Sequence, residues 1–156
     1  MSIKRKIIQE RYERRVQQAL VYIHENLGGP LDLNTVAKAS AFSSYHFHRI
    51  FRAFMAETLN EYVRRRRLEK AVHMLVVAED KAITDVALSC GFSSSSNFAK
   101  AFSNYFGCSP SEVRTPEKFK ANRKIGELKR KYGKDFDPRK FYPEIIRHTQ
   151  EEDMDV

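Results

Sequence analysis

The stretch Ile83–Arg114, ITDVALSCGFSSSSNFAKAFSNYFGCSPSEVR, repeats a pattern that occurs earlier in the chain. Val36-Ala37 corresponds to Val86-Ala87 at an offset of 50, and Phe47 corresponds to Phe98 at an offset of 51. The two copies stay aligned over this length apart from one extra residue in the second, which predicts one structural unit that is used twice. Each copy has the pattern of two helices separated by a short break.

The second helix of each copy has two different faces. At 100° per residue, the apolar side of the first copy collects Phe47, Ile50, Phe51 and Phe54, and the opposite side collects Tyr45, His48, Arg49 and Arg52. In the second copy Phe98, Ala101, Phe102, Tyr105 and Phe106 share a side, away from Ser96, Lys100, Ser103 and Asn104. We therefore expect one face to pack in a core and the other to be exposed. The exposed polar faces either contact a partner or are ordinary solvated surface.

Capping residues predict where these helices begin and end. Asp32 and Thr84 are candidate N-caps for the first helix of each copy, and Thr58 and Ser109 each begin a capping box. Gly91 and Gly107 are placed to make the turns of the second copy. In the first copy the corresponding residues are Ala41 and Ala56, which adopt a left-handed backbone less easily than glycine.

Two further helices frame the repeats. Val16, Ala19, Leu20, Ile23 and Leu27 line one face of the first, which Gly28–Pro30 should end. Residues 58–80 read as one long helix that contains the run Arg64–Arg67. We expect most of these arginines to be solvated and Arg67 to be packed or paired. No alternating strand pattern of useful length occurs, so the predicted fold class is all-α: two helix-turn-helix subdomains joined by a long linker helix.

Composition limits the possible functions. The chain has 156 residues, a net charge of +8 and a sequence pI near 9.6. This surplus favours an anionic partner such as nucleic acid. No apolar run reaches the roughly 18 residues that span a bilayer, and the N-terminus lacks the apolar core of a signal peptide. We therefore expect a cytoplasmic protein that does not bind a membrane. Cys90 and Cys108 lack metal-site spacing and are expected to be reduced, partly buried thiols.

The segment Ser43–Phe51, SSYHFHRIF, contains two histidines that invite a metal site. His46 and His48 are two residues apart, about 200° around a helix, whereas helical zinc pairs are four apart. The sequence shows no Gly-rich phosphate loop and no Ser-His-Asp order. We therefore expect no enzyme activity, no cofactor and no metal. The rival to DNA binding is a helical module that binds an acidic protein partner, such as an RNA polymerase subunit.

The repeat resembles the DNA-binding domain of the AraC/XylS family of bacterial transcription regulators. The similarity extends over roughly Arg11–Arg114 and is most specific in F-x-x-x-F-G-x-S-P-x-x-x-R, the ending of the second copy. It implies a sequence-specific regulator of transcription that binds double-stranded DNA with two recognition helices in successive major grooves, often in contact with RNA polymerase. Ala41, Ala56 and Val113 depart from the family pattern, and Lys100 stands where arginine is frequent.

The resemblance assigns the candidate site residues. Those expected to face DNA bases are Tyr45, His48, Arg49, Ser95, Ser96, Asn97 and Lys100. Weaker, phosphate-directed candidates are Ser43, Ser44, Arg52, Ser93, Ser94 and Ser111. Arginine can pair with guanine and asparagine with adenine, while serines near helix starts suit phosphate. Helix capping alone is the alternative for the serines.

The predicted domains follow from these assignments. They are an N-terminal arm (1–10), a first helix-turn-helix unit (11–57), a linker helix (58–79), a second unit (80–115), and a basic tail or linker (116–156). The sequence is most similar to family members that also carry a GyrI-like effector-binding domain. The residues of such a domain are absent from this sequence. A small-molecule effector would act only through such a domain. We expect the chain to be a truncated form, and a stand-alone regulator with a tail is the alternative.

Overall fold

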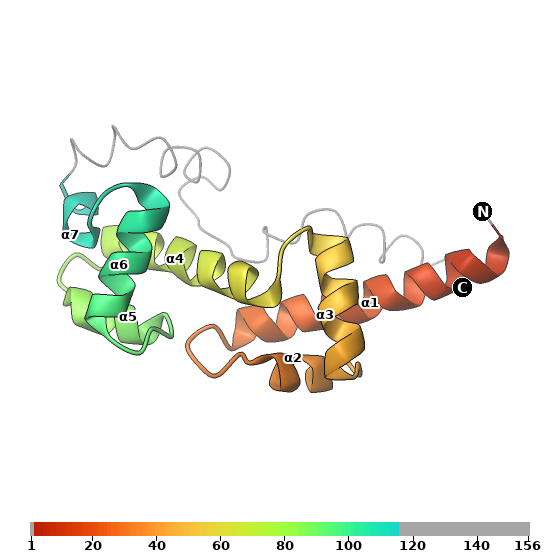
Figure 1. The fold of residues 1–156 in the computed structure, drawn as a ribbon. Helices are drawn as coiled ribbons and strands as arrows, with labels where there is room; N and C mark the ends of the chain where they lie inside the picture. The colour runs from red at the N-terminus through yellow and green to blue at the C-terminus, as the bar shows by residue number, and fades with distance from the viewer. Residues whose placement is uncertain (1, 116–156) are drawn as a thin grey trace. The chain divides into compact units, whose positions relative to one another are not determined.

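The computed structural model describes residues 2–115, and in this range every regular element is an α-helix (Figure 1). The expected all-α fold class is confirmed. The predicted tail, 116–156, lies outside the described residues. The helices belong to two compact units, and helix α4 (Leu59–Val77) begins in the first and continues into the second.

The first unit contains α1 (Ile3–Glu25), α2 (Leu33–Ala39), α3 (Ser44–Met55) and the start of α4. Its core is aromatic: the ring centroids of Phe47 and Phe51 are 5.3 Å apart, and Phe51 meets Tyr62 edge-on at 5.6 Å. The buried aliphatic side chains of α1 and α2 in this unit are Val16, Ala19, Leu20, Ile23, Val36 and Ala37. Residues 3–10, expected as an arm, are the first turns of α1.

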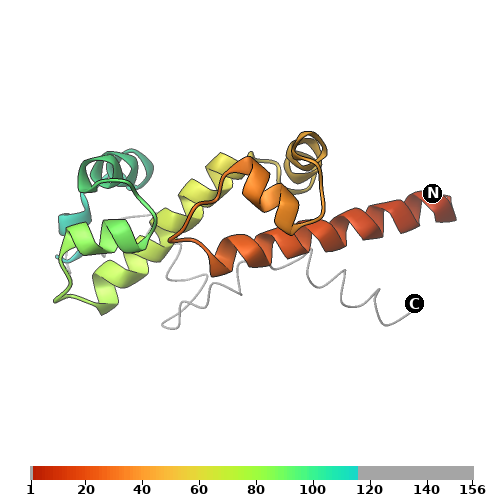
Figure 2. The same cartoon turned by 90° about the horizontal axis from the view of Figure 1, so that it is seen from below.

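The second unit contains the rest of α4, then α5 (Ile83–Ser89), α6 (Ser95–Phe106) and the short α7 (Pro110–Val113). Residues Leu27–Gly29 also belong to it. Phe98, Phe102 and Phe106 of α6 pack in its core with Leu68, Leu75 and Val86. Figure 2 gives a second view of α5 and α6 within this unit.

Most of the predicted helix starts are confirmed, and one is wrong. Asp32 caps α2 by accepting from the Thr35 N–H at 2.9 Å, and the capping boxes at Thr58 and Ser109 both form. Thr84, however, does not cap α5. That helix begins at Ile83, two residues before the start that a Thr84 cap would give, with Ala82 in the N-cap position and no side-chain cap. The polar side chain and the helix start are simply out of register.

The breaks within and after each helix pair use a left-handed backbone in both copies. Gly91 (φ 88°) and Gly107 (φ 74°) adopt it in the second copy, and Ala41 (φ 57°) and Ala56 (φ 58°) adopt it in the first. Alanine is disfavoured in this conformation because its Cβ approaches the backbone. The first copy therefore keeps the turn geometry of the second in spite of the less suitable residue.

The arginine run of α4 is less solvated than the sequence suggests. As expected, Arg67 is packed: its Nε donates to the Leu27 carbonyl at 2.9 Å, and its other donor contacts the Gly29 carbonyl at 2.7 Å. The expectation is wrong for Arg66, which is only 3% exposed and donates to Glu69 at 3.1 Å. Arg65 donates to the other oxygen of the same carboxylate. A buried carboxylate three residues along the helix accounts for this burial, because two charges that pair can leave solvent together.

Candidate nucleic-acid interface

Helix α3 presents an aromatic and basic face to solvent. Phe47 and Phe51 are 0% and 1% exposed, which fixes the helix against the first unit's core. Tyr45 is 72% exposed, and His48 and Arg49 are exposed beside it. Arg52 continues this face one turn further on. The expected alternation of core and surface residues is therefore present along α3.

The basic side chains of this face have no competing partners within residues 2–115. Neither His48, Arg49 nor Arg52 takes part in a hydrogen bond or an ion pair there. A guanidinium carries five N–H donors in a planar fork that matches two acceptors on one base edge. Arg49 therefore has its donors available for an outside acceptor without first breaking an internal contact.

Helix α6 presents a smaller and less charged face. Phe98 and Phe102 are fully buried, while Ser96, Asn97 and Lys100 are exposed. Ser95 is half-buried at the first position of the helix. Lys100, like Arg49, makes no hydrogen bond or ion pair among the described residues.

Asn97 is already engaged. Its side-chain amide donates to the Ser93 hydroxyl at 2.8 Å, and its backbone N–H donates to the Ser94 hydroxyl at 3.1 Å. The amide retains a second N–H and its carbonyl oxygen, so it can still present one donor and one acceptor to a base. The contact with Ser93 restricts the rotamer of Asn97 and so presents these groups in a defined direction.

The serines divide by role. Ser43 caps α3 and Ser94 caps α6, so capping accounts for both hydroxyls. Ser93 precedes Ser94, the cap of α6, and Ser111 lies in the first turn of α7, which Ser109 caps. The Ser44 hydroxyl donates to the Asn34 side chain of α2. Phosphate contact by these serines stays a prediction, and it would have to share hydroxyls that are already bonded.

Two arginines to which the sequence assigns no role make contacts that stabilise the units. The Arg15 guanidinium lies 5.2 Å from the centroid of the Phe42 ring and donates to the carbonyl of Ala41 at 3.5 Å, beside the strained turn. In the second unit, Arg114 donates from Nε to the Leu75 carbonyl at 3.2 Å and also to the carbonyls of Ala78 and Lys81. Arg114, the last residue of the motif, thus connects the end of α7 to the carbonyl groups at and after the end of α4.

Other kinds of site find no support in the described residues. No group of three metal-ligating side chains comes together in residues 2–115, and no helix there is long and apolar enough to cross a membrane. Cys90 is a buried thiol whose pKa is raised to about 11 by burial, so it stays protonated at neutral pH; Cys108 is half-buried, and neither cysteine forms a disulfide among the described residues. The expected partial burial is found for Cys108, whereas Cys90 is fully buried.

Comparisons with known proteins agree with this architecture. The family model of a helix-turn-helix domain matches residues 36–116. The regulatory protein SoxS of Escherichia coli is 33% identical over 103 residues, which cover 66% of this chain and 95% of SoxS. The transcriptional activator AarP of Providencia stuartii is 38% identical, with 64% and 73% covered. YkgA of Escherichia coli, an HTH-type regulator, is 39% identical, but the match covers 42% of its length.

Solved structures show the same fold. An AraC family regulator from Rhodopseudomonas palustris superposes with a TM-score of 0.58 at 29% identity, covering 65% of this chain and 94% of that one. The DNA-binding domain of AdpA, determined in complex with a target DNA, gives a TM-score of 0.63 at 24% identity, covering 68% and 95%.

The repeated units and their exposed second helices define a protein of the helix-turn-helix class. The chain belongs to the AraC/XylS family of transcription regulators, as its sequence motifs indicate.

Proposed function

We propose that this chain binds double-stranded DNA sequence-specifically by placing α3 and α6 in two successive major grooves, and that it regulates transcription without enzymatic activity. The observation that carries the proposal is the repetition of one arrangement: a phenylalanine face buried in the unit and a polar face exposed on the same helix. An ordinary solvated helix does not require the first-copy register to recur in the second.

The two helices would read different bases. Arg49 can donate two hydrogen bonds to guanine O6 and N7, and Tyr45 can contact a thymine methyl group or a phosphate. His48 would meet a base or a phosphate beside them. On α6, Asn97 can pair with adenine, and Lys100 supplies a single flexible charge where an arginine would give a fork. Ser95 and Ser96 complete this second set.

Phosphate contacts would hold the reading helices in register. Arg52 of α3 is the strongest candidate because it is exposed and charged. The serine candidates Ser43, Ser44, Ser93, Ser94 and Ser111 lie at or beside helix starts, where backbone N–H groups and the helix dipole favour anions. Counterion release makes all such binding weaker at higher salt.

The direct experiment is selection of bound sequences from random duplex DNA, repeated with Arg49→Ala and Lys100→Ala. Arg49→Ala should relax the preference in one half-site and Lys100→Ala in the other. If both variants keep the wild-type preference at every position, the residue assignment is wrong. If the wild type selects no preferred sequence, sequence-specific binding itself is wrong.

We further propose that the chain contacts RNA polymerase and acts in the cytoplasm. An activator must raise the occupancy or activity of the polymerase at its promoter, and the relative AarP is a transcriptional activator. Leu88 of α5, 52% exposed, offers an apolar contact away from the α6 core face. Leu88→Ala should lower transcription in a purified system without weakening DNA binding. Equal transcription by wild type and variant would exclude this contact.

A further inference from the structure

The outer face of α1 is apolar at both ends. Ile3, Ile7 and Val21 are 80%, 49% and 38% exposed. On a helix of 100° per residue these three lie within about 40° of one another. They point away from the buried Val16 and Leu20, which face the core of the first unit. The first turns of α1 therefore expose isoleucine on a helical segment that the unit's own core does not cover.

These residues follow the spacing of a coiled-coil seam. Steps of four and three residues connect Ile3 and Ile7 to Val21 through three polar positions. We refer to the six residues as the outer seam of α1. They are Ile3, Ile7, Glu10, Arg14, Gln17 and Val21.

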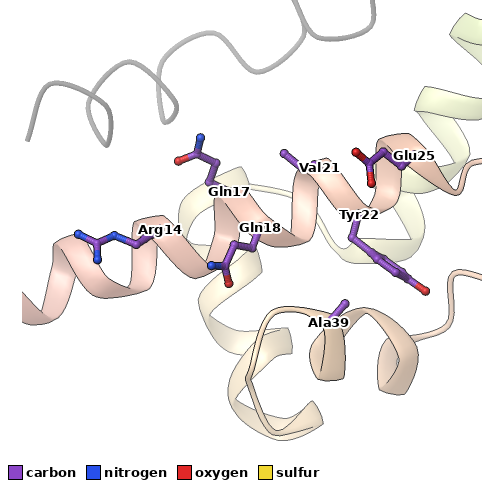
Figure 3. A pocket seen from close by; sticks show the side chains of 7 residues that line it. All are labelled: Arg14, Gln17, Gln18, Val21, Tyr22, Glu25 and Ala39. Carbon is purple, nitrogen blue, oxygen red and sulfur yellow. The ribbon is translucent and has the colours of Figure 1, made fainter. Parts of the chain in front are cut away.

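A groove of about 430 Å³ lies along the second half of the outer seam. It runs between α1 and α2: Val21 and Tyr22 come from α1, and Ala39 comes from α2 (Figure 3). Arg14 and Glu25 lie towards its two ends. An exposed apolar side chain at one end of the seam, Ile3, is thus matched by a partly apolar groove at the other end.

An antiparallel pair of α1 helices brings the two ends together. In such a pair each seam position faces the position that lies symmetrically about residue 12, so Ile3 of one copy meets Val21 of the other, at the groove. The same register sets Ile7 against Gln17 and Glu10 against Arg14, and every contact occurs twice because the two-fold interface is isologous. The paired length, residues 3–21, is roughly 27 Å at 1.5 Å per residue.

Charge selects the antiparallel arrangement. A parallel pair would place Glu10 on Glu10 and Arg14 on Arg14, both repulsive. The flanking Arg11 and Glu13 leave the central turns with two acidic and two basic side chains per copy, so the antiparallel centre is balanced. The Glu10 carboxylate lies 4.0 Å from Lys6 on its own helix, a weak surface pair that a better-placed guanidinium can replace.

We propose that the outer seam of α1 is a docking surface for a second copy of this chain, which binds antiparallel with its Ile3 in the groove beside Val21. The occupant is the same chain because Ile3, the groove beside Val21 and the opposite charges of Glu10 and Arg14 all lie along the outer seam of α1. A dimer of this kind would carry four reading helices and could occupy two operator sites at once. Because dimerisation is measured without DNA, a failure of this proposal can be distinguished from a failure of the proposed DNA binding.

Sedimentation equilibrium of the full chain in the absence of DNA tests the proposal. The apparent mass of the wild type should rise with concentration from 18.2 kDa towards twice that value. Glu10→Arg and Arg14→Glu should each weaken self-association by at least about tenfold, because each creates two like-charge contacts. An equimolar mixture of these two variants should associate as well as the wild type, since both contacts are then of opposite charge.

The matched control is Arg5→Glu, an equal change of charge on an exposed residue of α1 outside the outer seam. It should leave association unchanged, and far-UV circular dichroism should show all variants equally helical. A wild type that stays monomeric at several hundred micromolar overturns the proposal. So does self-association that survives Glu10→Arg, or a mixture of the two charge variants that remains monomeric.

Discussion

The first and second helix-turn-helix units use one architecture with different residues at the turns and on the exposed helix. Glycine makes both left-handed turns of the second unit, whereas Ala41 and Ala56 make those of the first. The exposed face of α3 has tyrosine, histidine and arginine, and that of α6 has serine, asparagine and lysine. The core must keep its phenylalanines in register for either unit to fold. The exposed face is free to differ, and the difference predicts two reading helices of unequal strength.

The largest effect should come from Gly91→Ala. A Cβ at this position would lie 2.5 Å from the Leu27 carbonyl oxygen and 2.7 Å from Arg67 Nε, on a backbone with φ of 88°. Strain and overpacking together should destabilise the second unit by about 3 kcal/mol or more, measured by urea denaturation. Ala41, at the corresponding turn, already has its Cβ, so Ala41→Gly should stabilise the first unit. A Gly91→Ala effect as small as that of Ala41→Gly would show that Leu27 and Arg67 do not crowd this position.

Next in size is the contrast between the two reading helices. Arg49→Ala should weaken binding to the selected DNA by about 1–3 kcal/mol, because a fork of two hydrogen bonds to one guanine is lost. Lys100→Ala should cost less, about 1 kcal/mol, because a single flexible ammonium makes fewer directed hydrogen bonds to a base than a guanidinium fork. Titration of both variants at two salt concentrations, with a mismatched duplex as control, measures this. A larger loss for Lys100 than for Arg49 would reverse the assigned order of the two helices.

A smaller pair of effects concerns the helix ends. No atom lies within 4 Å of a Cβ added at Gly107, so Gly107→Ala should cost only the left-handed strain, about 1 kcal/mol. Ala56→Gly should relieve the same strain at the end of α3 and stabilise the first unit by a similar amount. The two changes should therefore shift the denaturation midpoint in opposite directions. A loss of stability in Ala56→Gly would contradict the left-handed backbone at this position.

The smallest effects concern helix caps. Ala82→Asp should stabilise α5 by about 1 kcal/mol, because that helix has no side-chain cap. Asp32 caps α2 already, and hydrogen bonds from Thr35 lower the pKa of its carboxyl below the ordinary value of 3.8. A lowered pKa in the folded state means that this cap stabilises the fold above pH 4 and loses its effect as the pH falls through the folded value. Asp32→Asn should remove this acid-dependent component; an unchanged pH profile between 5 and 2 would show that the cap contributes nothing.

The sequence predicts the repeat, the all-α class and the exposed faces of α3 and α6, because helical periodicity and phenylalanine burial are local properties. It does not predict the contacts of Arg66 or Arg114. Four adjacent arginines look alike in sequence, and only packing decides that Arg66 pairs with Glu69 while Arg67 holds the Leu27 and Gly29 carbonyls. The Thr84 prediction failed although a good capping residue was present, because the cap position of α5 lies two residues earlier, at Ala82. The contact of Asn97 with Ser93 depends on a rotamer, which no spacing rule supplies.

A footprint on the selected DNA tests the central claim of two reading heads most directly. Hydroxyl-radical cleavage with wild type should show protection at two major grooves one helical turn apart, about 34 Å along the duplex, on one face. Arg49→Ala should lose protection at one groove and Lys100→Ala at the other. Protection of a single major groove by the wild type would contradict the account.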